Sequence, residues 1–240
     1  MSEQKVKPKP QMAKIVKVVK ETRDTSTLRL ELPKPFEWRP GQFIMVIANI
    51  NGENVRRAYS VASSPTKPYL EISIRQTETP TMSKYLNEVV EGDEIQIKGP
   101  YGKFIWDETV SPQIFCLAAG SGITPFRAYA QYIIDNNLKN PYKLLYSCPY
   151  GDDVIYYEEL PKLIGQIPNH EYKLFITREP RGLTNIEHGR INLDVLKKEI
   201  KGYENANFHL CGSPGFVTAL IDDLVEIGIP REQIKREQWG

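Results

Sequence analysis

The sequence is poor in the residues that build metal and disulfide sites, because its 240 residues include only three cysteines and three histidines. Cys116, Cys148 and Cys211 are too few and too far apart for a disulfide framework, and they form no C-x-x-C pair or iron–sulfur spacing. The histidines form no H-E-x-x-H motif. The sequence therefore predicts a protein of a reducing compartment that holds no metal ion.

The sequence also lacks an excess of one charge and any long hydrophobic run. Lys and Arg total 31 and Asp and Glu total 30, a net charge of +1 that argues against a polybasic surface for nucleic acid or membrane binding. The longest apolar stretch, Ile114–Ile134, is interrupted by Gly120, Gly122, Pro125 and Arg127, so we expect no membrane insertion. The N-terminus has no apolar segment typical of a signal peptide, and we expect a cytoplasmic protein.

The hydrophobic pattern divides the chain into two domains, as its length also allows at about 150 residues per domain. Residues 1–10 form a Lys- and Pro-containing tail that we expect to be mobile. Residues 11–107 hold short alternating segments between Gly- and Pro-containing turns, which is typical of an antiparallel barrel or sandwich. The expected strands are Ala13–Val19, Thr27–Leu32, Gln42–Ile50, Arg57–Ser63, Tyr69–Ile74 and Glu94–Lys98, with one helix at Ser83–Val89.

In residues 112–240 apolar strands alternate with helical segments, which predicts an α/β doubly wound parallel sheet. The expected strands are Ile114–Ala118, Lys143–Ser147, Lys173–Thr177, Asn207–Cys211 and Gln233–Arg236. The expected helices are Pro125–Asn136, Glu158–Ile164, Leu193–Ile200 and Pro214–Glu226. Ligands of such sheets bind at the carboxyl ends of the strands, where the strand order reverses.

Two glycine-containing turns each end a predicted strand and open a predicted helix. In the first turn, Gly120 and Gly122 allow a close approach to a pyrophosphate, Thr124 suits the N-cap and Pro125 suits the first helical position. The second turn is Cys211-Gly212-Ser213-Pro214. If the two strands are neighbours, both turns face one crevice and could hold two ends of a dinucleotide. The first turn alone is equally typical of an ordinary strand–helix connection, and the second turn alone is more typical of one.

Three further motifs lie in the first domain. Arg57-Ala58-Tyr59-Ser60 sets an anion ligand and an aromatic ring on one face of a strand, which suits a flat cofactor that bears a phosphate. Thr81 or Ser83 could cap the lone helix, whose first amides could bind a second phosphate. The turn Gly99–Phe104 is not a Walker A motif, because its lysine is followed by phenylalanine.

Taken in this order, five motifs closely resemble those of the ferredoxin–NADP⁺ reductase superfamily. They are Arg57–Ser60, Met82–Leu86, Gly99–Phe104, Gly120–Pro125 and Cys211–Pro214. The resemblance extends from about Ala13 to Trp239. It implies an N-terminal antiparallel Greek-key β-barrel that binds FAD rather than FMN, a C-terminal domain that binds NADH or NADPH, and no fused iron–sulfur domain.

For the flavin, the resemblance implies that Arg57 pairs with the pyrophosphate, Tyr59 stacks on the isoalloxazine ring and Ser60 lies near its N5, with Ala58 in the same motif. It also implies flavin contacts by the backbone of one strand end and by the helix start, namely Ile74, Arg75 and Gln76, and Thr81, Met82 and Ser83. Pro80 departs from the glycine that many members have there.

For the nucleotide, the resemblance implies that Gly120, Gly122, Thr124 and Pro125 form the turn that approaches it. Cys211 and Gly212 would flank the nicotinamide ring, and Ser147 and Arg178 would face the adenosine end. At the C-terminus, Glu237 would act in a polar relay and Trp239 would cover the flavin. The implied catalytic residues are therefore Ser60, Cys211, Glu237 and Trp239.

The choice between NADH and NADPH rests on few residues. Pro149 stands where many members have a basic residue, and Asp152 and Asp153 follow it, which slightly favours NADH. Arg178 and Arg181, after the third strand, could instead bind a 2′-phosphate.

The resemblance implies an NAD(P)H-dependent flavoprotein reductase that passes electrons through FAD to a separate acceptor. Ferredoxin, an oxygenase component, a haem protein or a small molecule would each serve as that acceptor. The alternatives are a flavin reductase that uses flavin as a substrate, an electron-transfer subunit of a larger redox complex, and a ligand-binding module without turnover.

Overall fold

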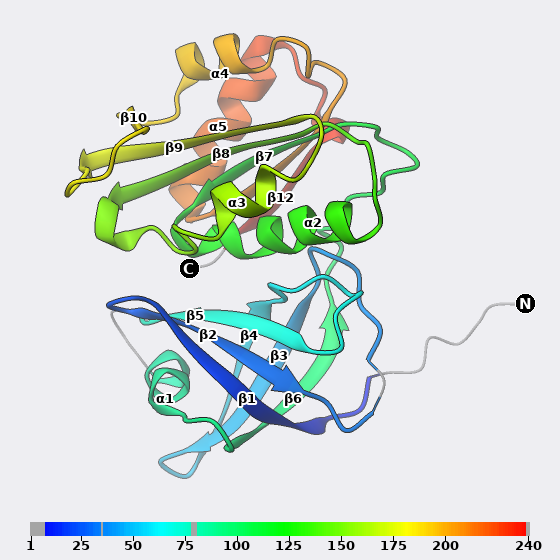
Figure 1. Cartoon of the computed structure of the whole chain (residues 1–240), viewed down its shortest axis with the longest axis vertical. Coiled ribbons are helices and arrows are strands. Elements are labelled where there is room, and N and C mark those ends of the chain that lie inside the picture. Colours follow the sequence, from blue (N-terminus) through cyan, green and yellow to red (C-terminus); the bar gives the residue numbers. More distant parts are fainter. Residues whose placement is uncertain (1–7, 35, 78–80, 239–240) are drawn as a thin grey trace, which may run out of the picture.

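Two six-stranded sheets follow one another along the chain and lie one above the other in Figure 1. The structure is a computed structural model, and it describes residues 8–34, 36–77 and 81–238. Most of the tail expected over residues 1–10 thus lies outside the described residues. In the part of the chain that is described, no helix is both long and apolar enough to cross a membrane.

The first sheet is antiparallel, with the strand order β4-β3-β6-β1-β2-β5. Its strands are β1 (Gln11–Thr22), β2 (Thr25–Glu31), β3 (Phe43–Ile50), β4 (Glu53–Ser60), β5 (Leu70–Arg75) and β6 (Glu94–Tyr101), and helix α1 spans Met82–Glu88. Val61 pairs with Ile72 of β5 just beyond β4, which brings the two edge strands together. Alternating apolar side chains such as Ile15, Leu28 and Ile44 fill the interior, which confirms the predicted barrel.

The second sheet is parallel, with the strand order β10-β9-β8-β7-β11-β12. Its strands are β7 (Ile114–Ala119), β8 (Tyr142–Tyr150), β9 (His170–Glu179), β10 (Glu187–His188), β11 (Asn207–Gly212) and β12 (Ile234–Gln238). The chain runs from β7 to one side and then returns to place β11 on the other side, so the order reverses at β7. This confirms the predicted doubly wound sheet and puts its crevice at β7 and β11.

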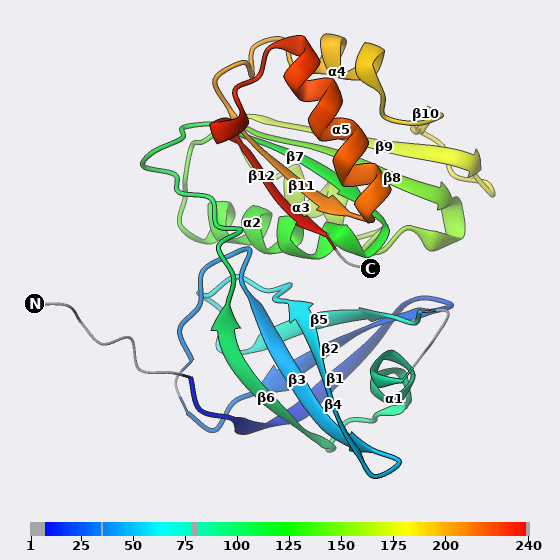
Figure 2. The same cartoon turned by 180° about the vertical axis from the view of Figure 1, so that it is seen from behind.

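Helices cover both faces of the parallel sheet (Figure 2). They are α2 (Thr124–Asp135), α3 (Leu160–Ile164), α4 (Leu193–Glu199) and α5 (Pro214–Ile227), with short 3₁₀ turns at Gly120–Ile123, Gly151–Asp153 and Arg231–Gln233. Phe126 of α2 and Leu160 of α3 belong to one apolar cluster, and Leu196 of α4 and Leu220 of α5 belong to the other. Helix α2 lies along the boundary with the barrel in both views.

The segment that joins the two sheets is held by side chains from both of them. Its carbonyl oxygens at residues 104–106 accept hydrogen bonds in turn from Tyr129 of α2 at 2.6 Å, Lys235 of β12 at 2.7 Å and Arg39 of the barrel at 3.4 Å. These bonds make the connection a fixed part of the structure.

Most expected elements are present, with small differences at their ends. The strand expected at Arg57–Ser63 begins earlier, at Glu53, and ends at Ser60. Asn51 and Gly52 both have positive φ, 53° and 85°, so they form a tight turn and pairing with β3 resumes directly after it. The two-residue strand β10 was not predicted, because it is too short to show a period.

Candidate nucleotide and flavin site

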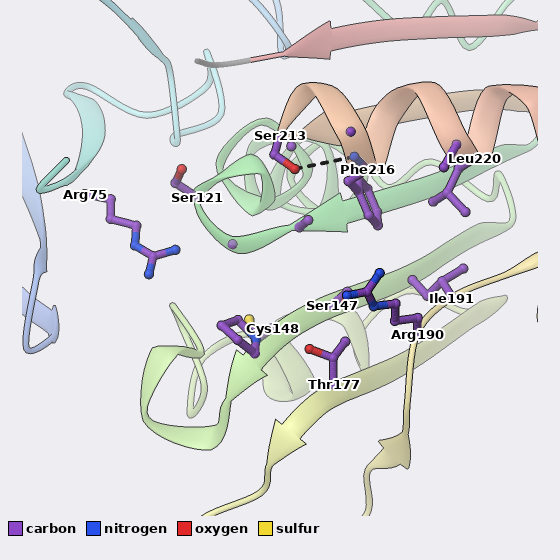
Figure 3. A pocket seen from close by; sticks show the side chains of 16 residues that line it. Arg75, Ser121, Ser147, Cys148, Thr177, Arg190, Ile191, Ser213, Phe216 and Leu220 are labelled. Atoms are coloured by element: carbon purple, nitrogen blue, oxygen red, sulfur yellow. Dashed lines mark hydrogen bonds between the residues drawn. The ribbon is translucent and has the colours of Figure 1, made fainter. Parts of the chain in front are cut away.

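A cavity of about 570 Å³ lies at the carboxyl ends of the central parallel strands (Figure 3). Ala119 of β7, Ser147 and Cys148 of β8, Thr177 of β9 and Gly212 of β11 line it. Its size falls in the range of cofactor sites, and its position is the crevice expected for a doubly wound sheet. Within the described residues, no cluster of three or more His, Cys, Asp and Glu side chains could hold a metal ion.

The two glycine-containing turns meet at this cavity. Strands β7 and β11 are hydrogen-bonded neighbours, as the dinucleotide interpretation required. A Cβ atom at Gly122 would lie 2.2 Å from the carbonyl oxygen of Cys211, and Gly120 has a φ of 53° that favours glycine. The backbone contact between the turns therefore depends on the lack of a side chain at residue 122.

The helix after the first turn begins differently from the prediction. Thr124 is the first residue of α2 rather than its N-cap, because the 3₁₀ turn Gly120–Ile123 precedes the helix without a break. The Thr124 hydroxyl donates to the carbonyl oxygen of Ser121 at 2.8 Å, so it closes the turn. Pro125 lies in the first helical turn, where its missing N–H leaves no bond unmade.

The second turn opens helix α5 with a side-chain cap. The Ser213 hydroxyl accepts from the backbone N–H of Phe216 at 3.4 Å, and both residues line the cavity. Cys211 is fully buried in β11, whereas Gly212 reaches the cavity wall. The structure thus brings Gly120, Gly212 and Ser147 to one cavity, whereas Cys211 is buried and does not line it.

Arg75 of the barrel forms the opposite wall of the cavity, across from Ser121 (Figure 3). Its guanidinium Nε donates to the Asp24 carboxylate at 3.1 Å, and its Nη1 lies 3.1 Å from the place of a Cβ atom on Gly120. Burial opposes the charged form, but Asp24 outweighs it and raises the pKa of Arg75. A cation thus faces the first turn from the other domain.

Residues Arg57, Ala58, Tyr59 and Ser60 form the second half of β4. Arg57 is exposed, and its guanidinium donates to the carbonyl oxygen of Arg56 at 2.8 Å. Tyr59 is partly buried, which raises its pKa to about 12, so its hydroxyl stays neutral. An exposed cation beside a neutral aromatic ring fits a phosphate-bearing flat cofactor such as FAD.

Several residues of the strand end and the helix start expected to contact flavin pack or hydrogen-bond within the barrel. Ile74 and Met82 are core residues, and the backbone N–H of Gln76 donates to the carbonyl oxygen of Asp24 at 2.8 Å. Thr81 occupies the N-cap position of α1 but its side chain makes no capping bond there. Ser83 does not cap the helix either, because it is the second residue of α1, and its hydroxyl accepts from the backbone N–H of Thr77 at 3.3 Å.

Ser60 is brought to the second domain by a contact across the boundary. Its hydroxyl donates to the Glu237 carboxylate of β12 at 3.3 Å, although 177 positions separate the two residues. Burial raises the pKa of Glu237 to about 7, and the bond from Ser60 only partly offsets this effect. Glu237 pairs in register with Cys211, so three of the four expected catalytic residues lie together. Trp239 lies outside the described residues.

The basic residues that were expected to face the adenosine end of a nucleotide are arranged differently from the prediction. Arg178 lies outside the cavity lining, with its guanidinium 2.8 Å from the Tyr150 hydroxyl, and Arg181 pairs with Asp152 at 2.6 Å. Arg190 lines the cavity instead and reaches toward Ser147 (Figure 3). Arg190 was not identified from the sequence. This residue lies in the loop between β10 and α4, and the course of that loop cannot be predicted from local sequence patterns.

Two domain families match the chain. Residues 12–106 match the oxidoreductase FAD-binding domain, and residues 116–221 match the oxidoreductase NAD-binding domain. The glycine betaine monooxygenase reductase subunit of Pseudomonas aeruginosa is 29% identical over 236 residues. The alignment covers 95% of this chain but 64% of that protein, so the chain spans less than two thirds of its relative's length.

Solved structures share the fold. The FAD/NAD-binding domain of a nitric oxide dioxygenase from Vibrio cholerae has a TM-score of 0.86 at 23% identity, and the alignment covers 96% of this chain and 98% of that one. A ferredoxin NADP⁺ reductase from Neisseria gonorrhoeae, solved with FAD and NADP, has a TM-score of 0.83 at 21% identity, with 96% and 98% covered.

Proposed function

We propose that this chain, which matches the oxidoreductase FAD-binding and NAD-binding domain families and shares the fold of a ferredoxin NADP⁺ reductase, is an NAD(P)H-dependent flavoprotein reductase that passes electrons through FAD to a separate acceptor. One observation carries the proposal: the Ser60–Glu237 bond joins the expected flavin strand to the strand pair that ends at the nucleotide cavity. We place the flavin domain at residues 11–107 and the nucleotide domain at residues 112–240.

In this proposal, residues of the barrel bind the flavin and residues of the second domain bind the nucleotide, so that the two rings lie face to face. Arg57 would pair with the flavin pyrophosphate and Tyr59 would stack on the ring, while the turns at Gly120 and Gly212 would hold the nucleotide. FAD, when bound, supplies the chemistry of accepting a hydride and releasing electrons singly. The protein contributes position, because hydride transfer requires the reacting atoms to lie about 3–3.5 Å apart.

Glu237 is suited to hold or move a proton at its carboxylate. With a pKa of about 7, it is present in both protonation states near neutral pH. The Ser60 hydroxyl, 3.3 Å from the Glu237 carboxylate, lies on the strand that would face the flavin. We therefore assign proton exchange with the flavin site to this pair.

Arg190 supports NADPH as the nucleotide. It lines the cavity, and among the described residues no Asp or Glu lines it. In doubly wound nucleotide domains a carboxylate reads the ribose hydroxyl of NAD, whereas an arginine accommodates the 2′-phosphate of NADP. This arrangement outweighs the slight preference for NADH drawn from Pro149, Asp152 and Asp153, since Asp152 is paired with Arg181.

The acceptor is proposed from the relatives. The Pseudomonas aeruginosa relative is the reductase subunit of a monooxygenase, and the Vibrio cholerae domain belongs to a nitric oxide dioxygenase. An oxygenase component or a haem protein therefore has the best support, with ferredoxin as a further candidate. The cytoplasmic location stays a prediction.

Anaerobic titration of the purified, FAD-loaded chain tests the proposal. NADPH should bleach the visible flavin band, and NADH should bleach it more slowly. A band that persists with both nucleotides would contradict the reductase and favour an electron-transfer subunit. A chain that binds no FAD at equilibrium but reduces added flavin would favour the flavin reductase.

A further inference from the structure

Helix α2 carries three polar side chains that bind one short segment of the barrel. They are Arg127, Gln131 and Asp135, spaced four residues apart, so they lie along one face of the helix. Arg127 and Gln131 are each only 7% exposed, although both are polar. Figure 1 shows this helix lying against the barrel along the boundary.

Each of the three side chains has a partner in residues 62–67. The Arg127 guanidinium donates to the carbonyl oxygen of Ala62 at 3.0 Å, and the Gln131 carbonyl accepts from the backbone N–H of Ser64 at 3.0 Å. The Asp135 carboxylate accepts from the Lys67 ammonium at 2.7 Å and from the Thr66 hydroxyl at 2.5 Å. Burial opposes ionisation of Asp135, but these two donors lower its pKa.

Arg127 also binds two carboxylates that belong to different domains. Its Nη1 lies 2.7 Å from Glu71 of β5, and its Nη2 lies 2.8 Å from Glu159, just before α3. The side chains of Arg127 and Glu71 are 8% and 3% exposed, so this ion pair is shielded from water and salt. Glu71 is further paired with Arg29 of β2 at 2.9 Å.

This contact connects segments that lead to the two halves of the proposed site. Ala62 follows Ser60 of the expected flavin strand by two positions, and α2 begins directly after the turn Gly120–Ile123 at the cavity. One helix thus links the nucleotide turn to the segment that continues the flavin strand. A tilt of α2 would move one half of the site relative to the other.

We propose that Arg127, Gln131 and Asp135 are positioning residues that set the distance between the bound nicotinamide and the flavin by fixing α2 on residues 62–67. The proposal rests on the proposed function. It predicts that loss of the contact changes the relative placement of the domains without changing the affinity for either ligand.

Distances between spin labels test the contact without any ligand. Labels would be attached to Val90→Cys on the barrel and Glu226→Cys on α5, both exposed positions, while Cys116, Cys148 and Cys211 are buried. The distance distribution should be narrow in the otherwise unchanged chain and broader, or shifted, in Arg127→Met. The matched control is Lys143→Met, which breaks an ion pair of similar burial within the second domain and should leave the distribution unchanged.

The second measurement is anaerobic flavin reduction by saturating NADPH. Arg127→Met should slow it roughly 10- to 100-fold, the effect expected of a displacement of about 1 Å, while the dissociation constants of FAD and NADPH stay within about twofold. If Arg127→Met does not fold, Gln131→Met and Asp135→Asn give the same readouts with a smaller expected change.

An unchanged distance distribution in the folded variants would overturn the proposal. A broader distribution with an unchanged reduction rate would also overturn it, because the contact would then not position the rings. If FAD in the unsubstituted chain is not reduced at all, the proposed function fails instead, and the ligand-free distances still report whether α2 fixes the domains.

Discussion

Two buried charge clusters have a similar composition but differ in location. One joins the barrel to the parallel sheet, and the other lies within the second domain. Arg127 binds Glu71 and Glu159 and so joins the barrel to the parallel sheet. Lys143 binds Glu199 at 3.1 Å and Glu171 at 2.7 Å, and all three belong to the second domain. Both cationic side chains are almost fully buried, so the cost of removing either cation is comparable. Of these two clusters, only the first joins the two domains, and with them the two halves of the proposed site.

The largest expected effect is on the free energy of unfolding. Lys143→Met and Arg127→Met should each lower it by about 3–5 kcal/mol, because each leaves a buried carboxylate short of a partner. Denaturant unfolding of both variants, followed by far-ultraviolet circular dichroism, measures this. If Lys143→Met also slowed flavin reduction, the two clusters would not differ in function, since any loss of stability would then disturb the site.

Arg190 lies within the second domain, so its removal should affect the binding of the nucleotide only. Arg190→Ala should lower the preference for NADPH over NADH roughly 10- to 100-fold, because a charge-assisted bond is worth about 1.5–3 kcal/mol. Steady-state kcat/KM with both nucleotides measures the preference. The control is Arg231→Ala. Arg231 lies just before the start of β12 and does not line the cavity, so this variant should leave the ratio unchanged. An equal loss with both nucleotides would argue that Arg190 does not read the phosphate.

On the barrel, Arg57→Ala should weaken FAD binding about tenfold through the loss of one charge-assisted bond. The adjacent Arg56→Ala is a matched control, because Arg56 is also exposed and its guanidinium Nε donates to the Asn54 side chain at 3.3 Å. Fluorescence titration of the flavin-free chain with FAD gives both dissociation constants. Equal values for the two variants would remove Arg57 from the flavin site.

The last expected effect concerns the pH dependence of stability and involves Glu237 at the boundary. The pKa of Glu237 is about 7 in the folded chain, compared with 4.5 for a glutamate exposed in the unfolded chain. Folding therefore favours the protonated form. Stability should therefore fall as pH rises from about 4.5 to 7, and Glu237→Gln should lose this part of the dependence. Thermal unfolding across that pH range checks it. A constant difference between the two chains at every pH would contradict the raised pKa.

Local sequence patterns predicted most of the fold and the two glycine-containing turns that reach the cavity. The alternation in Thr27–Leu32 and the apolar run Ile114–Ala118 both became strands, within two residues of the expected ends. Gly120 and Gly212 reached the cavity because strand–helix turns of a parallel sheet face one edge. The cap assigned to Thr124 was wrong, because the 3₁₀ turn Gly120–Ile123 runs directly into α2 and Ile123 takes the N-cap position.

The sequence by itself determined the elements, the two sheets and the two turns that meet at the cavity, since periodicity and glycine act over a few neighbouring residues. Tertiary structure alone decided that Arg127 and Gln131, which resemble a solvated helix face in the sequence, are buried. Arg127 and Glu71 are 56 positions apart, and Ser60 and Glu237 are 177 apart. A pairing at such separation depends on how two whole domains pack, and no short-range pattern encodes it.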